Sequence, residues 1–198
     1  MAPGVIILTA IFTSIFGGVN TLWDRRYGFM NKALTSPISR SAIAIGKMSA
    51  ISLIAALQAS LIIGIALAIG VTFPNPLMII PIMGIVILFS LGFSGISVTL
   101  AATAKSQETF WGMINLLGMP LFMLSPALFP LELLPSWLAV IAKLNPVTYT
   151  ILLVRELMTG VSEGGVPILL SIGVILAFVI AMVAIASYVF TREVNKPF

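Results

Sequence analysis

The sequence contains neither cysteine nor histidine, and only six of its 198 residues are acidic. Without cysteine there can be no disulfide and no thiolate chemistry, and without histidine the commonest metal ligand of proteins is missing. The acidic residues are Asp24, Glu108, Glu132, Glu156, Glu163 and Glu193. Because they are scattered outside the apolar runs and form no familiar catalytic constellation, we expect no catalytic residue, metal site or bound cofactor on this chain.

Charge of either sign is also scarce. Charged residues make up 8% of the chain, against about 25% in soluble domains, while 60% of the residues are hydrophobic and the mean hydropathy is +1.18. Apolar runs of about 20 residues, the length that crosses a bilayer as a helix, recur along the chain. Lipid offers backbone groups no other partner, so these runs must be helical. The composition predicts an all-α, polytopic transmembrane domain in the cell membrane.

Five apolar runs predict five membrane spans in a single domain covering residues 1–198. The predicted spans are residues 3–22, 48–71, 77–103, 110–129 and 166–190. The fourth span is expected to be broken, because proline removes a helix hydrogen bond and clashes with the preceding turn. Its prolines are Pro120, Pro126 and Pro130.

The segment between the fourth and fifth spans, residues 130–165, is mixed in composition. We expect two short helices in it, one over residues 138–144 lying in the membrane interface and one over Val147–Met158. Non-helical backbone at membrane depth must be buried in protein or line a cavity. The proline-broken span and the stretch Leu131–Lys143 are therefore candidates for a gate or re-entrant element, with simple proline kinks as the alternative.

The distribution of lysine and arginine predicts topology, since cytoplasmic loops of membrane proteins carry the excess of these residues. The loops after the first and third spans and the C-terminal tail hold eight of the ten, and the other loops hold two. We therefore place the loop 23–47, the Lys105 loop and the C-terminus in the cytoplasm, with Met1 and residues 130–165 outside. The modest net positive charge reports this topology and gives no reason to expect nucleic-acid binding.

The spans carry no internal source of energy. None has an ionisable residue in its core, and proton-coupled carriers usually need such groups; a sodium site built from carbonyls and hydroxyls stays open. A P-loop is absent as well, because Met48 follows Gly46-Lys47 and Ser41 stands where the motif needs its first glycine. If this protein does work, a partner must supply the energy.

The segment from Trp23 to Lys47 carries five of the ten basic residues. Within Trp23–Leu34, apolar residues at helical spacing lie opposite polar ones, which predicts an amphipathic helix at the cytoplasmic face. Ser36 and Pro37 are typical of a helix N-cap and first turn, which predicts a second short helix over Ile38–Ile45. Residue types alone favour a passive orientation anchor over a docking lever for a cytoplasmic partner.

Polar side chains inside the spans are candidates for lining a translocation path. They are Thr9, Thr13, Gln58, Ser90, Ser94, Ser97 and Asn115. Such residues in membrane helices more often hydrogen-bond a neighbouring helix, so both roles stay open.

Two stretches of the chain follow recognisable patterns. After Pro3-Gly4 and the first span comes WDRRYGFMNKALTSPISRSAIAIGK, with an acidic-basic cluster, a glycine, SPxSR and GK in that order. Later, FMLSPALFPLELLPSWLAVIAKLNPVTYTILLVREL carries Leu-Pro, Asn-Pro, tyrosine and arginine. With the order of the spans, these stretches resemble the ABC-2 type transporter permeases, the membrane subunits of daunorubicin-resistance and polysaccharide or lipid-linked exporters.

The resemblance implies a role for each stretch. The first would hold the ATPase-coupling loop, at Asp24, Arg25, Arg26, Gly28, Ser36, Pro37, Arg40, Gly46 and Lys47. The second would hold the family signature, a candidate gate, at Pro135, Asn145, Pro146, Tyr149 and Arg155. Family members generally have six spans with both termini inside. Five spans here therefore lead us to expect that the first transmembrane helix is lacking.

The resemblance also implies partners. Two permeases would pair as a homodimer or heterodimer, and each would bind a separate ABC ATPase subunit that holds ATP and magnesium. The exported substrate would be a hydrophobic drug, a lipid or a glycan-linked molecule. The residues by themselves leave two other functions open, a stand-alone passive channel or facilitator and a non-transporting membrane assembly subunit.

Overall fold

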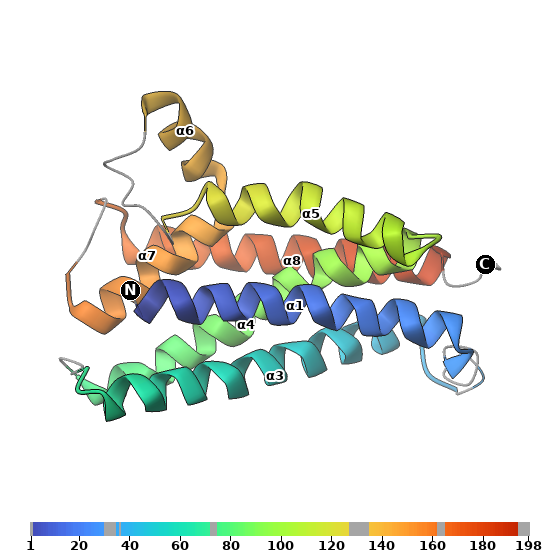
Figure 1. Cartoon of the computed structure of the whole chain (residues 1–198), viewed down its shortest axis with the longest axis horizontal. Coiled ribbons are helices and arrows are strands. Elements are labelled where there is room, and N and C mark those ends of the chain that lie inside the picture. The colour runs from blue at the N-terminus through green and yellow to red at the C-terminus, as the bar shows by residue number, and fades with distance from the viewer. Residues whose placement is uncertain are drawn as a thin grey trace.

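A computed structural model describes residues 2–29, 35, 37–71, 75–126, 135–161 and 165–193. These residues form helices, turns and loops and contain no strand, which confirms the all-α fold. The long helices run side by side as an elongated bundle, with the two chain ends at opposite ends of it (Figure 1). In chain order the elements are α1 (Ala2–Arg26), α3 (Arg40–Ala68), the short 3-10 helix η1 (Pro76–Met78), α4 (Ile79–Thr103), α5 (Gln107–Met123), α6 (Ser136–Leu144), α7 (Pro146–Thr159) and α8 (Ile168–Glu193).

Four helices are long and apolar enough to cross a membrane: α1, α3, α4 together with η1, and α8. They correspond to the first, second, third and fifth predicted spans. The predicted fourth span corresponds to α5, which has only 17 residues. The bent pair α6–α7 could count as a fifth span by length and composition. The structure therefore has four to five candidate spans.

Pro120 does not break α5, contrary to the prediction. The helix continues through it to Met123, and Leu124 N still donates to the Pro120 carbonyl at 2.9 Å. A proline near a helix end removes only one hydrogen bond, and here the carbonyl it frees belongs to the well-exposed Leu116. Pro126 lies beyond the end of α5, and Pro130 lies outside the described residues.

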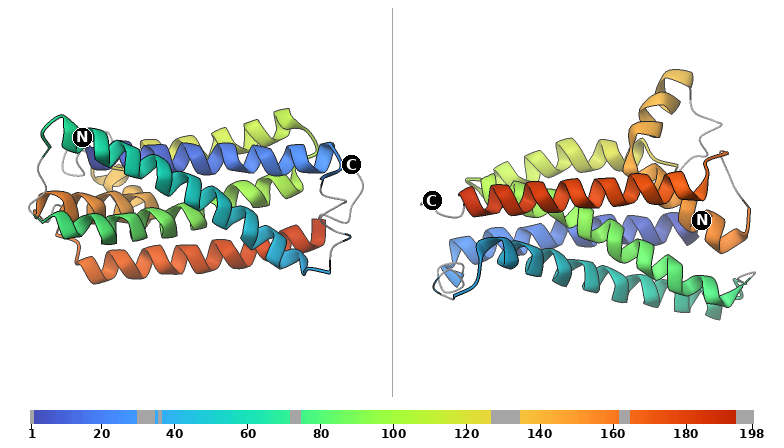
Figure 2. Two further views of the ribbon diagram at one scale, coloured as in Figure 1. Left: turned by 90° about the horizontal axis from the view of Figure 1, so that it is seen from below. Right: turned by 180° about the vertical axis from the view of Figure 1, so that it is seen from behind.

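Helix α4 is the centre of the bundle and packs against α1, α3 and α8 along its length (Figures 1 and 2). Its buried rings, Phe89 and Phe93, belong to one core cluster with Ile6 and Ile7 of α1 and Phe110 of α5. Exposed leucines and isoleucines cover the outer faces of α3 and α8. An apolar outer surface around a packed centre is the arrangement expected of a helix bundle in lipid.

Two glycines of α4 allow α8 to approach closely. A Cβ on Gly92 would lie 2.8 Å from the Phe178 ring, and one on Gly95 would lie 3.0 Å from the Met182 carbonyl. Small residues at helix contacts are a common device of membrane bundles. Because these contacts leave no room for a methyl group, both positions need glycine.

The structure corrects two expectations about the segment after α1. The described part of Trp23–Leu34 is not one helix: α1 ends at Arg26, and Gly28 takes a left-handed conformation (φ 77°) that only glycine adopts readily. The prediction of a separate short helix over Ile38–Ile45 was also wrong. Ser39 is the N-cap, accepting from Ala42 N, and α3 runs unbroken from Arg40 to Ala68 because no proline interrupts it.

The two short helices expected before the last span are present as α6 and α7, and the bend between them is 82°. Figure 1 and the right-hand view of Figure 2 show α6 projecting away from the bundle, while α7 lies within its end. Helix α7 is buried on all sides around Ile151 and Leu153, and it ends at Gly160 in the left-handed conformation. Of the predicted gate or re-entrant stretch Leu131–Lys143, residues 131–134 lie outside the described residues and the rest is Pro135 and most of α6, so the gate stays a prediction.

Candidate coupling and signature sites

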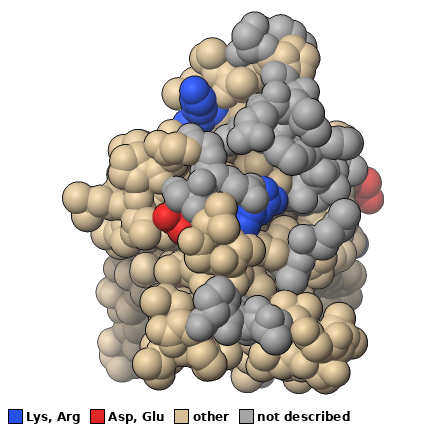
Figure 3. Space-filling view, turned by 90° about the vertical axis from the view of Figure 1, so that its left-hand side faces the viewer, with Lys and Arg blue, Asp and Glu red and all other residues tan. Residues whose placement is uncertain are grey.

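Charged side chains gather at one end of the bundle, which we call the basic end. It comprises the last turns of α1, α4 and α8 and the first turns of α3 and α5, and its described charged residues are Asp24, Arg25, Arg26, Arg40, Lys47, Lys105, Glu108, Arg192 and Glu193. The opposite end, where α6 projects, carries only Lys143, Arg155 and Glu156 among its described residues. Figure 3 looks onto that opposite end and shows few, scattered charges among its described residues.

Two contacts at the basic end tie three helices together. Lys47 of α3 forms an ion pair with Asp24 of α1, and both side chains are partly exposed, at 22% and 39%. Arg25 of α1 donates from Nη1 to the carbonyl oxygens of Ala101, at 3.2 Å, and Ala102, in the last turn of α4. A displacement of this part of α1 would therefore pull directly on α3 and α4.

The other residues of the predicted coupling loop surround these contacts without joining them. Arg26 and Gly46 are exposed on helices α1 and α3, and Pro37 is exposed just before α3. Arg40 opens α3, and Gly28 forms the turn that ends α1. Ser36 lies outside the described residues.

The neighbouring loop between α4 and α5 belongs to the same electrostatic environment. A hydrogen bond from the Ser106 hydroxyl is the main reason that the pKa of Glu108 lies below its ordinary value, and the charge of Arg26 lowers it further. The Glu108 carboxylate is therefore ionised at neutral pH beside the end of α1, on the water-facing side of the apolar part of α5.

At the opposite end, Asn145 links the signature to α5. Its Oδ1 accepts from Val147 N at 3.0 Å and caps α7, while Nδ2 donates to the Leu121 carbonyl of α5. The side chain is buried, at 5% exposure, so the bond to Val147 is shielded from water and the bond to Leu121 partly so. Pro146 occupies the first position of α7, where its missing N–H costs nothing.

The remaining signature residues also bind carbonyl oxygens or begin helices. Arg155 Nη2 donates to the Pro126 carbonyl at 3.0 Å, and Tyr149 Oη donates to the Lys143 carbonyl at 2.7 Å. The Pro135 carbonyl accepts from Leu138 N and Ala139 N at the start of α6. The signature thus holds α6 and α7 to each other and to the chain after α5.

The structure brings three of the candidate path residues into one groove. Thr13 of α1 donates to Gln58 Oε1 of α3, and both line an open groove of about 560 Å³ together with Thr9. Asn20 lines the same groove but was not among the candidate path residues. It could have been predicted, because positions 9, 13 and 20 lie on the same face of a helix. Gln58 is exposed despite lying in the middle of α3. An exposed amide at membrane depth is costly in lipid.

The serines of α4 lie elsewhere, in the packed centre of the bundle. Ser97 donates to the Ser14 carbonyl of α1 at 2.6 Å, and Ser94 donates to the Leu91 carbonyl at 2.9 Å. Ser90 Oγ is buried and finds no hydrogen-bond partner among the described residues. Asn115 lies apart from both groups, on α5, beside a small pocket of about 90 Å³.

Comparison with known proteins places this arrangement in a family. A sequence model described as "ABC-2 type transporter" matches residues 1–159, from the start of α1 through α7. The chain belongs to the ABC-2 type transporter family. It is 32% identical over 156 residues to a putative transport permease, ycf38, of Cyanophora paradoxa, covering 78% of this chain and 54% of that protein.

More distant relatives carry similar names. The chain is 23% identical over 151 residues to the probable multidrug ABC transporter permease YbhR of Escherichia coli, covering 75% of this chain and 40% of that protein. It is 23% identical over 181 residues to the daunorubicin resistance ABC transporter permease protein DrrB1 of Streptomyces coeruleorubidus, covering 89% and 64%. The chain spans about half the length of the ycf38 protein of Cyanophora paradoxa.

In this ABC-2 family member, the acceptors of the key hydrogen bonds could not have been predicted from sequence. Arg25 binds the carbonyls of Ala101 and Ala102, and Arg155 binds the carbonyl of Pro126. Every residue has a carbonyl, so these partners leave no signature in the sequence. Only the donors carry a recognisable residue type.

Proposed function

We propose that this chain is the permease subunit of an ATP-driven exporter, and that a separate ABC ATPase docks on its basic end. The observation that carries the proposal is the pair of contacts made by Asp24 and Arg25, which join the end of α1 to α3 and α4. Any push on the segment 23–47 would act on three spans at once. ATP and magnesium would bind on the partner, since this sequence has no P-loop.

The excess of basic residues at this end supports a cytoplasmic location for it. The proposal therefore places the basic end and the C-terminus in the cytoplasm, the α6 end outside, and the whole in the cell membrane. Closure of the ATPase subunits on ATP would be transmitted through Trp23–Lys47, with Lys105 and Glu108 as a second contact. A permease dimer would then switch between access states.

The groove between α1 and α3 is the proposed part of the substrate path on this chain. We place its Thr13–Gln58 pair at membrane depth because both residues lie in the middle of long apolar helices, on a surface that the described residues leave open. Polar groups at that depth normally face protein or a water-filled cavity. A second permease, identical or different, would cover it. Phe12 and Phe16 make the groove mainly apolar, which suits a hydrophobic drug, a lipid or the lipid part of a glycan carrier.

The test is ATP-dependent transport and ATPase stimulation in proteoliposomes containing the permease and an ABC ATPase from the same organism. Lys47→Glu should abolish most of the stimulation, since it places two carboxylates together, and the exchange Asp24→Lys with Lys47→Asp should restore it. Lys143→Glu makes the same charge change at the opposite end and should leave stimulation intact. Full flux without any ATPase would contradict the proposal and favour a passive facilitator.

A further inference from the structure

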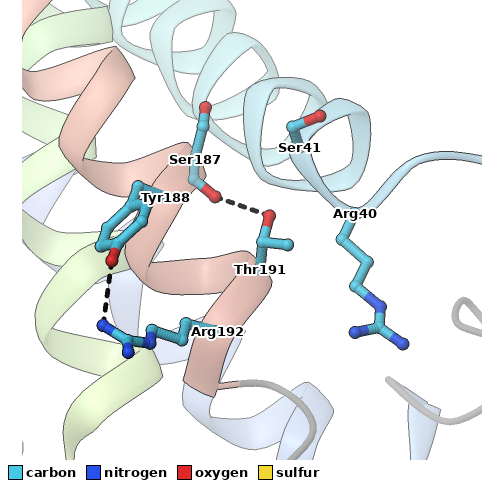
Figure 4. Close-up of a pocket in the computed structure, with 6 residues that line it drawn as sticks. All are labelled: Arg40, Ser41, Ser187, Tyr188, Thr191 and Arg192. Atoms are coloured by element: carbon cyan, nitrogen blue, oxygen red, sulfur yellow. Dashed lines mark hydrogen bonds between the residues drawn. The ribbon is translucent and has the colours of Figure 1, made fainter.

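An open hollow of about 720 Å³ lies at the basic end between the first turn of α3 and the last turns of α8. Figure 4 shows Ser187 and Thr191 of α8 on one side and Arg40 and Ser41 of α3 on the other. Its lining residues are Arg40, Ser41, Ser187, Tyr188, Thr191 and Arg192. Two arginines and four hydroxyl-bearing side chains, with no carboxylate among them, make a surface suited to an anion.

The positive charge of this hollow is not neutralised by the described residues around it. Arg40 makes no hydrogen bond or ion pair with the described part of the chain, whereas Arg192 donates to Tyr188 Oη at 2.9 Å, a neutral partner. The three described acids of the basic end are engaged elsewhere, Glu108 with the Ser106 hydroxyl and the charge of Arg26. Asp24 pairs with Lys47, and Glu193 interacts electrostatically with Arg25.

The position of the hollow relative to the membrane indicates what kind of anion it binds. Arg40 begins one candidate span and Arg192 lies in the last turn of another, so both belong to the membrane interface. Directly beside them the surface becomes apolar, with Ile45 and Ile185 exposed by 41% and 44%. Tyr188 is 63% exposed; its hydroxyl accepts from Arg192, and the Arg192 guanidinium carbon lies 5.7 Å from the centre of its ring. Tyrosines with an apolar ring and a hydrogen-bonded hydroxyl are typical of the interface.

We propose that this hollow binds the phosphate of an anionic phospholipid headgroup. Arg40 and Arg192 attract the phosphate, the Ser41 hydroxyl offers a further hydrogen bond, and the acyl chains lie over Ile45 and Ile185; the Thr191 hydroxyl already donates to the Ser187 carbonyl. An acidic surface of a cytoplasmic protein would satisfy the arginines but would leave the exposed apolar side chains below them uncovered. The lipid satisfies both, which is why the geometry favours it.

The test is a lipid titration of the purified full chain in detergent, followed by native mass spectrometry and by thermal unfolding. Phosphatidylglycerol should bind with one tightly held molecule per chain and raise the unfolding temperature. Phosphatidylcholine, which has the phosphate but no net charge, should bind more weakly. Inorganic phosphate at the same concentration should give no stabilisation, and equal stabilisation by phosphate would overturn the lipid assignment.

Arg40→Gln and Arg192→Gln should each weaken phosphatidylglycerol binding about fivefold, the effect of one basic residue near an anionic surface. Lys105→Gln removes the same charge at the same end but outside the hollow, and should leave the tight site unchanged. Ser41→Leu keeps both arginines while filling the hollow, and should also weaken binding. The proposal is overturned if the double arginine variant keeps the tight site, or if it loses only ATPase stimulation.

Discussion

The two ends of this bundle hold their helices together by different chemistry. At the basic end, α1 is joined to α3 by an ion pair between partly exposed side chains, and to α4 by an arginine on carbonyl oxygens. At the α6 end, Asn145 is buried and makes neutral hydrogen bonds that both cap α7 and attach it to α5. The basic end relies on an ion pair that water and salt can weaken, whereas the main link at the α6 end is a buried, uncharged side chain.

This difference matches what each end would have to do in an exporter. Exposed ion pairs contribute little to stability, typically about 0–1 kcal/mol, so the ends of α1, α3 and α4 could shift against one another at low cost. Buried hydrogen bonds are costly to break, because an unsatisfied polar group is left behind. The signature end therefore suits a fixed frame and the basic end a movable one.

The largest expected effect comes from Asn145→Ala. It removes the α7 cap and leaves the Leu121 carbonyl without its donor, which should cost about 2–3 kcal/mol of unfolding free energy. Asn75→Ala is the matched control: Asn75 also precedes a proline and accepts from a backbone N–H at 3.0 Å, but it is exposed. Its loss should cost only about 0.5–1 kcal/mol. Equal losses in denaturant titrations of the purified protein would remove the distinction between the ends.

Arg155→Met comes next. The variant keeps the apolar stem but leaves the buried Pro126 carbonyl without its donor, and should cost about 1–3 kcal/mol. Arg26→Met, which changes an exposed arginine at the basic end, should stay within about 0.5 kcal/mol of the wild type. The same denaturant titration measures both, and a larger loss for Arg26→Met would contradict the proposed division.

Asp24→Asn tests the movable end. The variant should lose about 0.5–1 kcal/mol of unfolding free energy at low salt, and this loss should shrink as salt is added, because the pair with Lys47 is partly exposed. Stability of the signature variants relative to wild type should not depend on salt. A salt-independent loss for Asp24→Asn would show that this pair behaves as a buried contact.

The smallest effect is expected for Tyr149→Phe. The Tyr149 hydroxyl donates to the Lys143 carbonyl from an exposed position, and water can replace it, so the loss should be about 0.5 kcal/mol. The Tyr27 hydroxyl makes no hydrogen bond within the described residues, so Tyr27→Phe should leave the free energy of unfolding unchanged. A loss of several kcal/mol for Tyr149→Phe would mean that the α6–α7 bend depends on this one bond.

Much of the candidate site could be predicted because its donors are distinctive residue types. The helix over Val147–Met158 was predicted, and it is present as α7, with Asn145 as its N-cap. The basic segment and the end of the bundle it belongs to were equally apparent. The start of α3 was misplaced because Ser36-Pro37 and Ser39 both look like caps, and only the fold shows that Ser39 is one.

The path candidates show the same limit. Thr13 and Gln58 were indistinguishable by type from the serines of α4, yet the first two line an open groove while Ser94 and Ser97 bond within the packed centre. Which face of a helix meets another helix depends on neighbours far away in the sequence. In a chain whose helices are apolar all round, periodicity gives almost no warning of that choice.

The sequence by itself determined that this protein is helical and crosses the membrane, because sparse charge and long apolar runs leave the backbone no other way to satisfy its hydrogen bonds in lipid. It also determined which end of the bundle is basic. The tertiary structure decided the rest: that Asp24 meets Lys47, that Arg25 meets the end of α4, and that the signature binds carbonyls of the chain around the end of α5. These contacts depend on helix packing, which in the Arg25–Ala102 contact joins residues 77 positions apart.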